Sequence, residues 1–439
     1  MTSDFYNTTI GEQITLQRGF DITKKEQKEG RIPVVSSGGV SSYHNVAKVS
    51  GPGVILGRKG TLGTVFFIEE DYWPHDTTLW VKDFKGNNPS FVYYFFKNIS
   101  KQLKSMDVGA ANPALNRNHV HPLEITWPRN EVQDHISKIL SSLDKKIKNN
   151  DRVNQTLEKM AQALFKSWFV DFEPVKAKMA VLDAGGSQED ATLAAMTAIS
   201  GKETDALMVF EREHPEQYVE LKATAELFPS AMQKSELGIP DGWSLGPLSN
   251  IAIFANGKVD VSSLTPETYI STENMLENRA GISTATSFPS VNSVPSFRTG
   301  HVLISNIRPY FKKIWLARYS GGRSADVLAF EARDAVTVEY IYNLLYQESF
   351  FDFMMLTSKG VKMPRGDKTA IMAWQCICPD KKISDAFSKA VGKYYSFIEI
   401  NNTQNKTLTQ FRDTLLPKLL SGEITLPEAE QAVKEVEHV

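Results

Sequence analysis

Hydrophobic residues recur at alternating steps of four and three over residues 133–169, QDHISKILSSLDKKIKNNDRVNQTLEKMAQALFKSWF. This spacing predicts a long helix with a coiled-coil seam rather than an ordinary amphipathic helix. Two asparagines, Asn150 and Asn154, fill the two middle positions of the seam. The other seam positions are Ile136, Leu140, Leu143, Ile147, Leu157, Ala161, Leu164 and Trp168.

The same pattern returns without a gap over residues 384–420, at a constant offset of 251 residues. Asn401 and Asn405 take the two middle positions again, and Arg412 is the one clear break in the apolar series. We expect the two helices to pack on each other, with the central asparagines facing each other in an antiparallel pair. A parallel pairing in register would match them too, but the connecting segment favours the antiparallel one. Asparagines on a frayed solvent-exposed face are the other alternative. The apolar seam positions of this copy are Phe387, Val391, Tyr394, Ile398, Leu408, Leu415 and Leu419.

A strand-rich segment precedes each long helix. Short strands with glycine turns and an aromatic helix follow one another in the first segment, and the second repeats this plan with different residues. We therefore predict an α+β fold with a pseudo-two-fold internal repeat, in which two long helices form an antiparallel coiled coil. Helices of about 37 residues would span about 55 Å and fix a distance between the domains. The predicted segments are domain 1 (1–130), spacer helix 1 (131–170), an acidic connector with one or two short helices (171–240), domain 2 (241–380), spacer helix 2 (381–422) and a C-terminal tail (423–439).

Composition describes an ordinary non-membrane protein of 439 residues with a net charge of −2. The acidic excess lies in residues 171–240, and the first domain is mildly basic. No apolar run approaches the length of a membrane span, and the N-terminal stretch lacks the features of a signal peptide. Cys376 and Cys378 lie two apart on a predicted strand, a spacing that suits neither a disulfide framework nor a zinc site. We expect a cytoplasmic protein.

Several of these stretches carry a resemblance to a known family. They are the PVVSSGGV loop, the GVILGRKGTLGTV strand pair, the closing segment ANPALNRNHVHPLEITWP, and the two long helices, the second ending in LLPKLLSGEI. With the domain-helix-domain-helix order, the chain resembles the specificity subunit of type I restriction-modification enzymes over nearly its full length. It departs from the family pattern in its longer 171–240 segment and in TGHVLISNIRPYFKK, which lacks the glycines of GRKG.

The resemblance implies that each domain is a target-recognition domain reading one half of a split site on double-stranded DNA. It implies that the helices set the spacing and dock two modification subunits, which bring S-adenosylmethionine and methylate adenine. Restriction subunits would bring ATP, magnesium and cleavage. The chain itself would bind no cofactor or metal and carry no catalysis.

Candidate DNA-binding residues lie in glycine-flanked or amide-rich loops. Arginine and lysine reach guanine edges or phosphates, amides pair with adenine edges, and Ser/Gly turns offer backbone N–H groups to phosphate. The competing interpretation for each is a plain solvated turn. The aromatic stripes around Phe91 and Phe350 are expected in the core. In domain 1 the candidates are Ser36, Ser37, Gly38, Gly39, Arg58, Lys59, Asn112, Asn116, Arg117, Asn118 and His119; in domain 2 they are Asn306, Arg308, Lys312, Lys313, Arg323, Lys359, Lys362 and Arg365.

The sequence bears on four alternative functions. Asn88-Pro89-Ser90-Phe91 is a near miss to the methyltransferase loop Asn-Pro-Pro-aromatic, but it lacks the second proline and a preceding glycine-rich turn. A nucleotide-driven motor would need a Gly-x-x-x-x-Gly-Lys-Ser/Thr loop, which the sequence does not contain. A coiled-coil scaffold without sequence-specific DNA binding, and an orphan methylation subunit without restriction, both remain compatible with the sequence.

Overall fold

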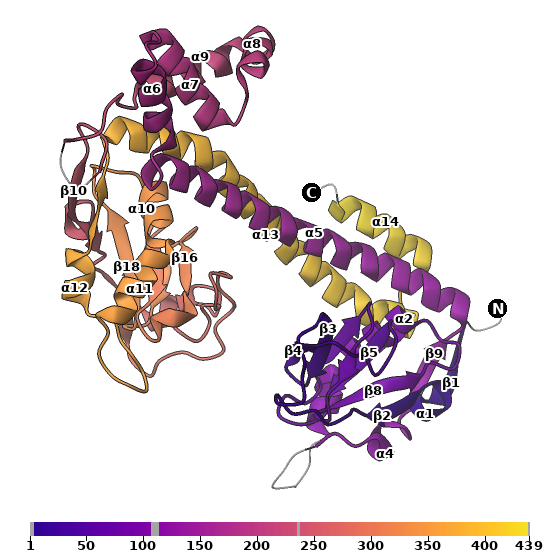
Figure 1. Cartoon of the computed structure of the whole chain (residues 1–439). Helices are drawn as coiled ribbons and strands as arrows, with labels where there is room; N and C mark the ends of the chain where they lie inside the picture. The colour runs from indigo at the N-terminus through magenta and orange to yellow at the C-terminus, as the bar shows by residue number, and fades with distance from the viewer. Residues whose placement is uncertain (1–3, 107–113, 235–237, 438–439) are drawn as a thin grey trace. The chain divides into compact units, whose positions relative to one another are not determined.

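The computed structural model describes residues 4–106, 114–234 and 238–437. The chain divides into two compact units: unit 1 comprises Met1–Arg152 and Asn401–Val439, and unit 2 comprises Val153–Ile400. Each unit contains one strand-rich domain and a section of each long helix (Figure 1). No helix among the described residues has the length and apolarity to cross a membrane.

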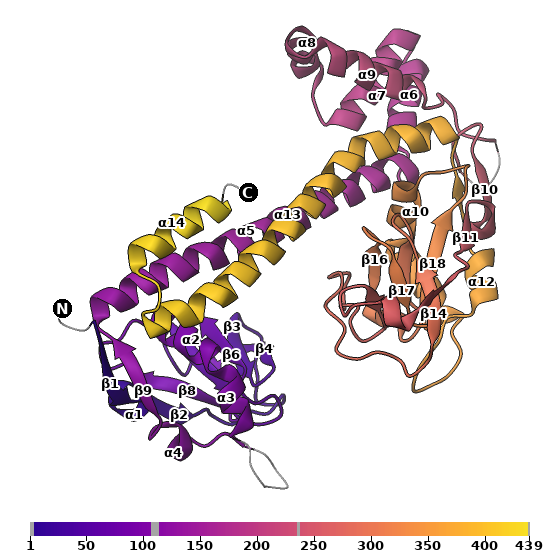
Figure 2. The ribbon, with the colours of Figure 1, turned by 180° about the vertical axis from the view of Figure 1, so that it is seen from behind.

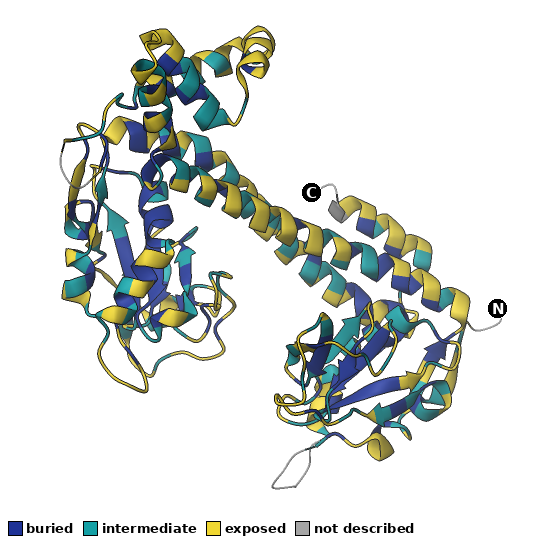
Figure 3. Ribbon diagram, viewed as in Figure 1, coloured by how far each residue is buried: buried dark blue, intermediate teal, exposed yellow. Residues whose placement is uncertain are grey.

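Antiparallel and mixed sheets build the domain of unit 1. The central sheet has the order β2-β8-β5-β6, a second has the order β4-β3-β7, and β1 pairs with β9. All of β5 and the first four residues of β8 are buried (Figure 3). The strands are β1 Phe5–Thr9, β2 Thr15–Arg18, β3 Ile32–Ser36, β4 Gly39–His44, β5 Gly53–Gly57, β6 Val65–Ile68, β7 Trp73–Pro74, β8 Thr78–Asp83 and β9 Glu124–Pro128, with helices α1 Ile10–Gln13, α2 Pro89–Asn98, α3 Ser100–Ser105 and α4 Arg117–Val120.

The domain of unit 2 repeats this strand order. In its sheet β11-β18-β15-β16, as in β2-β8-β5-β6, the strand that comes last in the sequence lies between the first and the second. β10 pairs with β19 as β1 pairs with β9. A further sheet has the order β12-β14-β17-β13. The strands are β10 Ser244–Pro247, β11 Ala252–Phe254, β12 Lys258–Asp260, β13 Tyr269–Ile270, β14 Ser293–Phe297, β15 Val302–Ser305, β16 Ile314–Leu316, β17 Gly321–Arg323, β18 Val327–Ala332 and β19 Gln375–Cys378; the helices are η1 Leu248–Asn250, η2 Val261–Ser263, η3 Pro309–Phe311, α10 Val338–Leu345, α11 Glu348–Leu356 and α12 Lys368–Ala373.

The two long helices are α5, Asn130–Phe169, and α13, Lys381–Ser421. In unit 1, Asn150 of α5 donates from Nδ2 to Oδ1 of Asn405 in α13 at 2.9 Å. In unit 2, the rings of Phe165 and Phe387 meet edge to face with centroids 5.7 Å apart. In unit 1, Arg412 also pairs with Asp144, so residue numbers rise along α13 as they fall along α5. The contact of Phe165 with Phe387 joins the last part of α5 to the first part of α13. The predicted antiparallel pairing is therefore confirmed within each unit.

Both domains attach to the long helices through repeat-related contacts, which we call the helix seat. In unit 1 the N-cap of α2, Asn88, receives a hydrogen bond on Oδ1 from Ser137, and its backbone N–H donates to Gln133. In unit 2 the N-cap of α10, Thr337, donates from its backbone N–H to Ser384 at 2.9 Å. Ser384 is the residue 251 positions after Gln133, so the repeated helix position holds the cap of the domain helix in both units.

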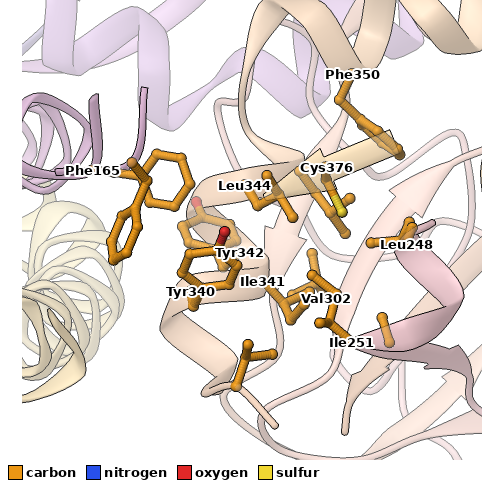
Figure 4. Close-up of a cluster of buried hydrophobic side chains, with 14 of the residues drawn as sticks. Phe165, Leu248, Ile251, Val302, Tyr340, Ile341, Tyr342, Leu344, Phe350 and Cys376 are labelled. Carbon is orange, nitrogen blue, oxygen red and sulfur yellow. The ribbon is translucent and has the colours of Figure 1, made fainter. Parts of the chain in front are cut away.

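The aromatic residues of α2 and α11 fill the cores, as the sequence predicts. Phe91, Phe96 and Phe350 have no exposed surface. Figure 4 shows the core of unit 2, where Phe165 of α5 faces Tyr340 and Tyr342 of α10. This apolar contact fixes the domain of unit 2 to its section of α5.

The structure corrects two predicted segments. The connector contains four helices in its described part rather than one or two, and Ala195, Met196, Leu207 and Ala225 give it a small core of its own. Alanine and leucine at helical spacing suffice for such a core, although the segment is acidic. The helices are α6 Glu173–Asp183, α7 Gln188–Ser200, α8 Thr204–Glu213 and α9 Pro215–Glu226.

The predicted C-terminal tail is a helix, α14, Leu426–Glu437. It lies along the unit 1 section of α5 (Figures 1 and 2). Ala429 and Val433 are buried in the core of unit 1. Apolar residues at a spacing of four give the helix one buried stripe, so residues 423–439 are not an irregular tail.

Candidate nucleic-acid interface

Three loops that are distant in the sequence meet at one edge of the unit 1 sheets. The Ser36–Gly39 turn joins β3 to β4, and the 58–64 loop joins β5 to β6. The Ser37 carbonyl accepts a hydrogen bond from Thr64 Oγ1 at 2.7 Å. The Leu115 N–H donates to the carbonyl of Arg58 at 3.0 Å, which brings in the segment before α4. The structure therefore brings the Ser36–Gly39 turn, the 58–64 loop and the start of the segment before α4 together.

The loop after Gly57 is tightly closed. A Cβ at Gly57 would lie 2.1 Å from the Thr61 carbonyl, so only glycine fits there. The backbone N–H groups of Arg58 and Lys59 both donate to the carbonyl of Thr77. This anchoring fixes the backbone of the loop and leaves the side chains of Arg58 and Lys59 partly exposed.

Arg58 shares its surroundings with a second arginine, Arg18, at the end of β2. Arg18 pairs with Asp76 at 2.7 Å, and Arg58 donates to the backbone carbonyl of Asp76 at 3.3 Å. Burial lowers the pKa of Arg58, Arg18 adds repulsion, and Asp76 partly offsets both. Two guanidinium groups close together favour binding of an anion such as phosphate.

The amide-rich segment before β9 is exposed. Asn116 caps α4 by accepting from the Asn118 N–H at 3.0 Å, so its side-chain oxygen already has a local partner. Arg117, Asn118 and His119 are exposed on the short helix that follows. Asn112 lies outside the described residues.

One group of side chains in the described ranges has the geometry of a metal site: Asp21, His75 and Asp76. The Asp76 carboxylate is engaged by Arg18, and His75 Nδ1 lies 3.0 Å from Thr77 Oγ1. The neighbouring arginines disfavour a cation at this place, so the cluster fits better as part of the loop scaffold.

The equivalent edge of the unit 2 domain also gathers its loops. The 306–313 loop joins β15 to β16, as the 58–64 loop joins β5 to β6. The Arg308 N–H donates to the Pro364 carbonyl at 2.8 Å, which joins this loop to residues 357–367. Arg365 pairs with Asp326 at 3.2 Å, and Lys359 pairs with Asp367 at 2.6 Å. Arg308, Lys359, Lys362 and Arg365 therefore belong to one surface.

Two domain 2 candidates are corrected by the structure. Arg323 is not in an exposed loop; it lies on β17, is 8% exposed, and donates to the carbonyls of Ser296, Ala255 and Val327. Asn306 is 6% exposed and donates to the Gly366 carbonyl. Both side chains satisfy buried backbone groups, so neither is available to DNA in this structure.

Lys312 and Lys313 are turned toward partners within the domain. Lys312 forms an ion pair with Glu348, which also pairs with Arg279 at 3.0 Å. Lys313 donates from Nζ to the Thr272 carbonyl at 2.8 Å. Their part in a DNA contact stays a prediction.

Sequence reasoning missed Arg18, Asp76 and Thr77, which organise the unit 1 surface. A single arginine at a strand end carries no signal in the sequence. The pair His75-Asp76, directly before a buried strand, is only a weak signal in the sequence.

The fold and the two loop clusters define a duplicated binding protein, with two domains of like topology each joined to α5 and α13. Residues 3–159 match the family model described as the type I restriction modification DNA specificity domain. The chain is 31% identical over 337 residues to the type I restriction enzyme HindI specificity subunit of Haemophilus influenzae, covering 71% of each chain. The chain belongs to the specificity subunits of type I restriction enzymes.

Two further comparisons agree. The chain is 24% identical over 354 residues to the type I restriction enzyme MjaIX specificity subunit of Methanocaldococcus jannaschii, covering 77% of this chain and 69% of that one. The crystal structure of the type I restriction-modification S subunit from M. genitalium superposes with a TM-score of 0.50 at 14% identity, covering 94% of this chain and 96% of that one. The latter likeness supports the fold alone.

Proposed function

We propose that this chain is the DNA-recognition subunit of a type I restriction-modification complex and that each domain reads one half of a split site on double-stranded DNA. The observation that carries this is the equivalence of the two loop clusters. In both domains the loop after the third strand of the β2-β8-β5-β6 order is hydrogen-bonded to the segment before the closing strand, and both clusters carry arginine and lysine. Like scaffolds with different loop residues suit the reading of two different half-sites.

The long helices supply the second part of the proposal, because they dock two modification subunits that bring S-adenosylmethionine and methylate adenine. Val153 and Met160 of α5 are exposed, as are Phe397 and Ile400 of α13, at 40%, 46%, 58% and 61%. Residues seven apart and three apart share a helix face, so each helix presents apolar surface that a partner subunit would cover.

Restriction subunits, where present, bring ATP, magnesium and cleavage to the complex. The chain itself contributes recognition without catalysis and works in the cytoplasm.

The test is genome-wide adenine methylation in cells that carry this chain with its modification subunit. The expected result is a single split motif modified on both strands, absent from cells that carry the modification subunit alone. An assembled complex that methylates no defined motif would contradict the proposal and favour a coiled-coil scaffold. Transformation with unmodified plasmid then separates an orphan methylation subunit from one that works with restriction subunits.

A further inference from the structure

A short loop of unit 2, residues 360–364, presents apolar side chains beside cations, and we call it the apolar tip. Val361 is 100% exposed and Met363 is 49% exposed. Single exposed apolar side chains are ordinary. Two of them within five residues, on the surface that carries the DNA-binding candidates of domain 2, call for a partner with an apolar group.

The base of the tip is held firmly. Lys359 and Arg365 exchange both backbone hydrogen bonds, each 2.9 Å long. Gly360 turns the chain with a φ of +95°, which suits glycine. The Pro364 carbonyl accepts the N–H of Arg308. A tip that is already ordered loses little conformational entropy when it binds.

Charge around the tip points to a nucleic acid. Lys359 and Arg365 are paired with carboxylates at the base. Lys362, which lies between Val361 and Met363 in the sequence, makes no ion pair or hydrogen bond within the described residues. Its ammonium group is therefore available for a phosphate, and the two apolar residues are its neighbours in the sequence.

In the major groove of DNA, the apolar group on the base edges is the C5-methyl of thymine. We propose that the apolar tip recognises thymine in the second half-site, with Val361 packed against this methyl group and Lys362 contacting a neighbouring phosphate. The inference rests on the proposed function, since it assigns a base to one loop of the same surface.

The test is a double-mutant cycle that combines truncation of the Val361 side chain with removal of one thymine methyl group. Each thymine of the second half-site is replaced in turn by deoxyuridine, which keeps the base pair but lacks the methyl. The dissociation constant of the assembled complex is measured for the wild type, Val361→Ala and Val219→Ala. Val219, on α9, is 66% exposed and serves as the matched control.

Replacement of one thymine by deoxyuridine should weaken binding by the wild type about four-fold. This is the change in the dissociation constant expected when one buried methyl group is lost. Val361→Ala should bind the thymine site several-fold more weakly and lose this discrimination, whereas Val219→Ala keeps it. Lys362→Ala should weaken binding to every sequence alike and reduce the salt dependence by about one counterion.

The inference is wrong if no thymine of the second half-site is sensitive, or if Val361→Ala still discriminates thymine from deoxyuridine. It is also wrong if Val361→Ala fails to assemble with the modification subunit, since the tip is then a protein contact. A wild-type complex that binds no split site at all refutes the proposed function itself, and this outcome is visible before any variant is made.

Discussion

Asp144 of α5 holds the domain of unit 1 on the helix pair, and its removal should be costly. Its carboxylate accepts the Tyr94 hydroxyl at 2.7 Å and pairs with Arg412, whose side chain is 11% exposed. Burial acts to lower the pKa of Arg412, but the hydrogen bond and charge of Asp144, with those of Asp413, outweigh it and raise the pKa. The guanidinium therefore stays charged and needs its partner.

Asp144→Ala leaves that charge poorly compensated and the buried Tyr94 hydroxyl without an acceptor. Breaking a buried ion pair from one side costs about 3–5 kcal/mol, and a lost acceptor about 1 kcal/mol. Asp413 still contacts Arg412 at 2.7 Å and offsets part of the loss. We expect a net destabilisation of unit 1 of about 3 kcal/mol. Asp385→Ala is the matched control, because its pair with Lys381 is about half exposed at both ends and is worth about 0.5 kcal/mol.

Native-state hydrogen exchange of the full chain measures this effect, since it reports the opening of α2 separately from that of unit 2. The protected amides of α2 should exchange about 100-fold faster in Asp144→Ala, which corresponds to about 3 kcal/mol. Tyr94→Phe alone should give a smaller change, and the double variant less than the sum of the two. An effect of Asp144→Ala no larger than that of Asp385→Ala would refute the reasoning.

The remaining predictions address pH, specificity and spacing. Burial raises the pKa of Glu158 to about 7 from its usual 4.5, although Gln162 and Arg318 act in the opposite direction. The folded state then binds the extra proton between these values, so unit 2 should lose about 1–3 kcal/mol of stability as pH rises from 4.5 to 7; urea unfolding of Glu158→Gln should lack this slope. Arg58→Ala should change the base preference of the first half-site only, as read by methylation motifs; equal loss on every sequence would assign Arg58 to phosphate. Arg323→Met should cost about 2–4 kcal/mol in urea unfolding without altering the motif, because it strips three buried carbonyls of their donor. Four residues inserted after Asn150, with a matching insertion in α13, add about 6 Å and should lengthen the unspecified gap by one or two base pairs; an unchanged gap would contradict a spacer role.

The long helices were predictable from sequence because their signal is periodic and repeated. The bounds of α5 and α13, Asn130–Phe169 and Lys381–Ser421, follow the 4-3 pattern closely. The order of the strands within the sheets of each domain was harder to predict from the sequence. Their duplication showed in the repeated plan of short strands and an aromatic helix before each long helix, yet pairing between distant strands depends on long-range contacts that no local pattern encodes.

The DNA-binding role of the candidate residues stays a prediction, but the structure shows which of them lie on exposed loops and which are buried. Arg58 and Arg365 lie where their loops converge, whereas Arg323 is buried on β17. All three arginines stand next to a glycine in the sequence. What separates them is whether nearby backbone carbonyls lack partners, and only the folded chain shows this. The prediction for residues 171–240 was wrong for a different reason. The acidic composition of the segment drew attention away from the small apolar residues that fill its core.

The break in the second seam at Arg412 has a structural cause that also explains how each domain is held. Arg412 pairs across the helices with Asp144, and Asp144 accepts the hydroxyl of Tyr94. In the repeat, position 144 corresponds to Tyr395, whose hydroxyl accepts from Asn343 at 2.8 Å. Asn343 lies six residues after the cap of α10, as Tyr94 lies six after the cap of α2.

In unit 1 the tyrosine of this contact, Tyr94, belongs to the domain helix α2, whereas in unit 2 it is Tyr395 of the long helix α13. The two helix positions that contact each other are the same in both units. A hydrogen bond between these positions fixes the domain helix on its seat in either arrangement. The constraint shared by the two halves is the contact rather than the residue, which allows the recognition loops to differ while both domains keep a defined orientation on their helices.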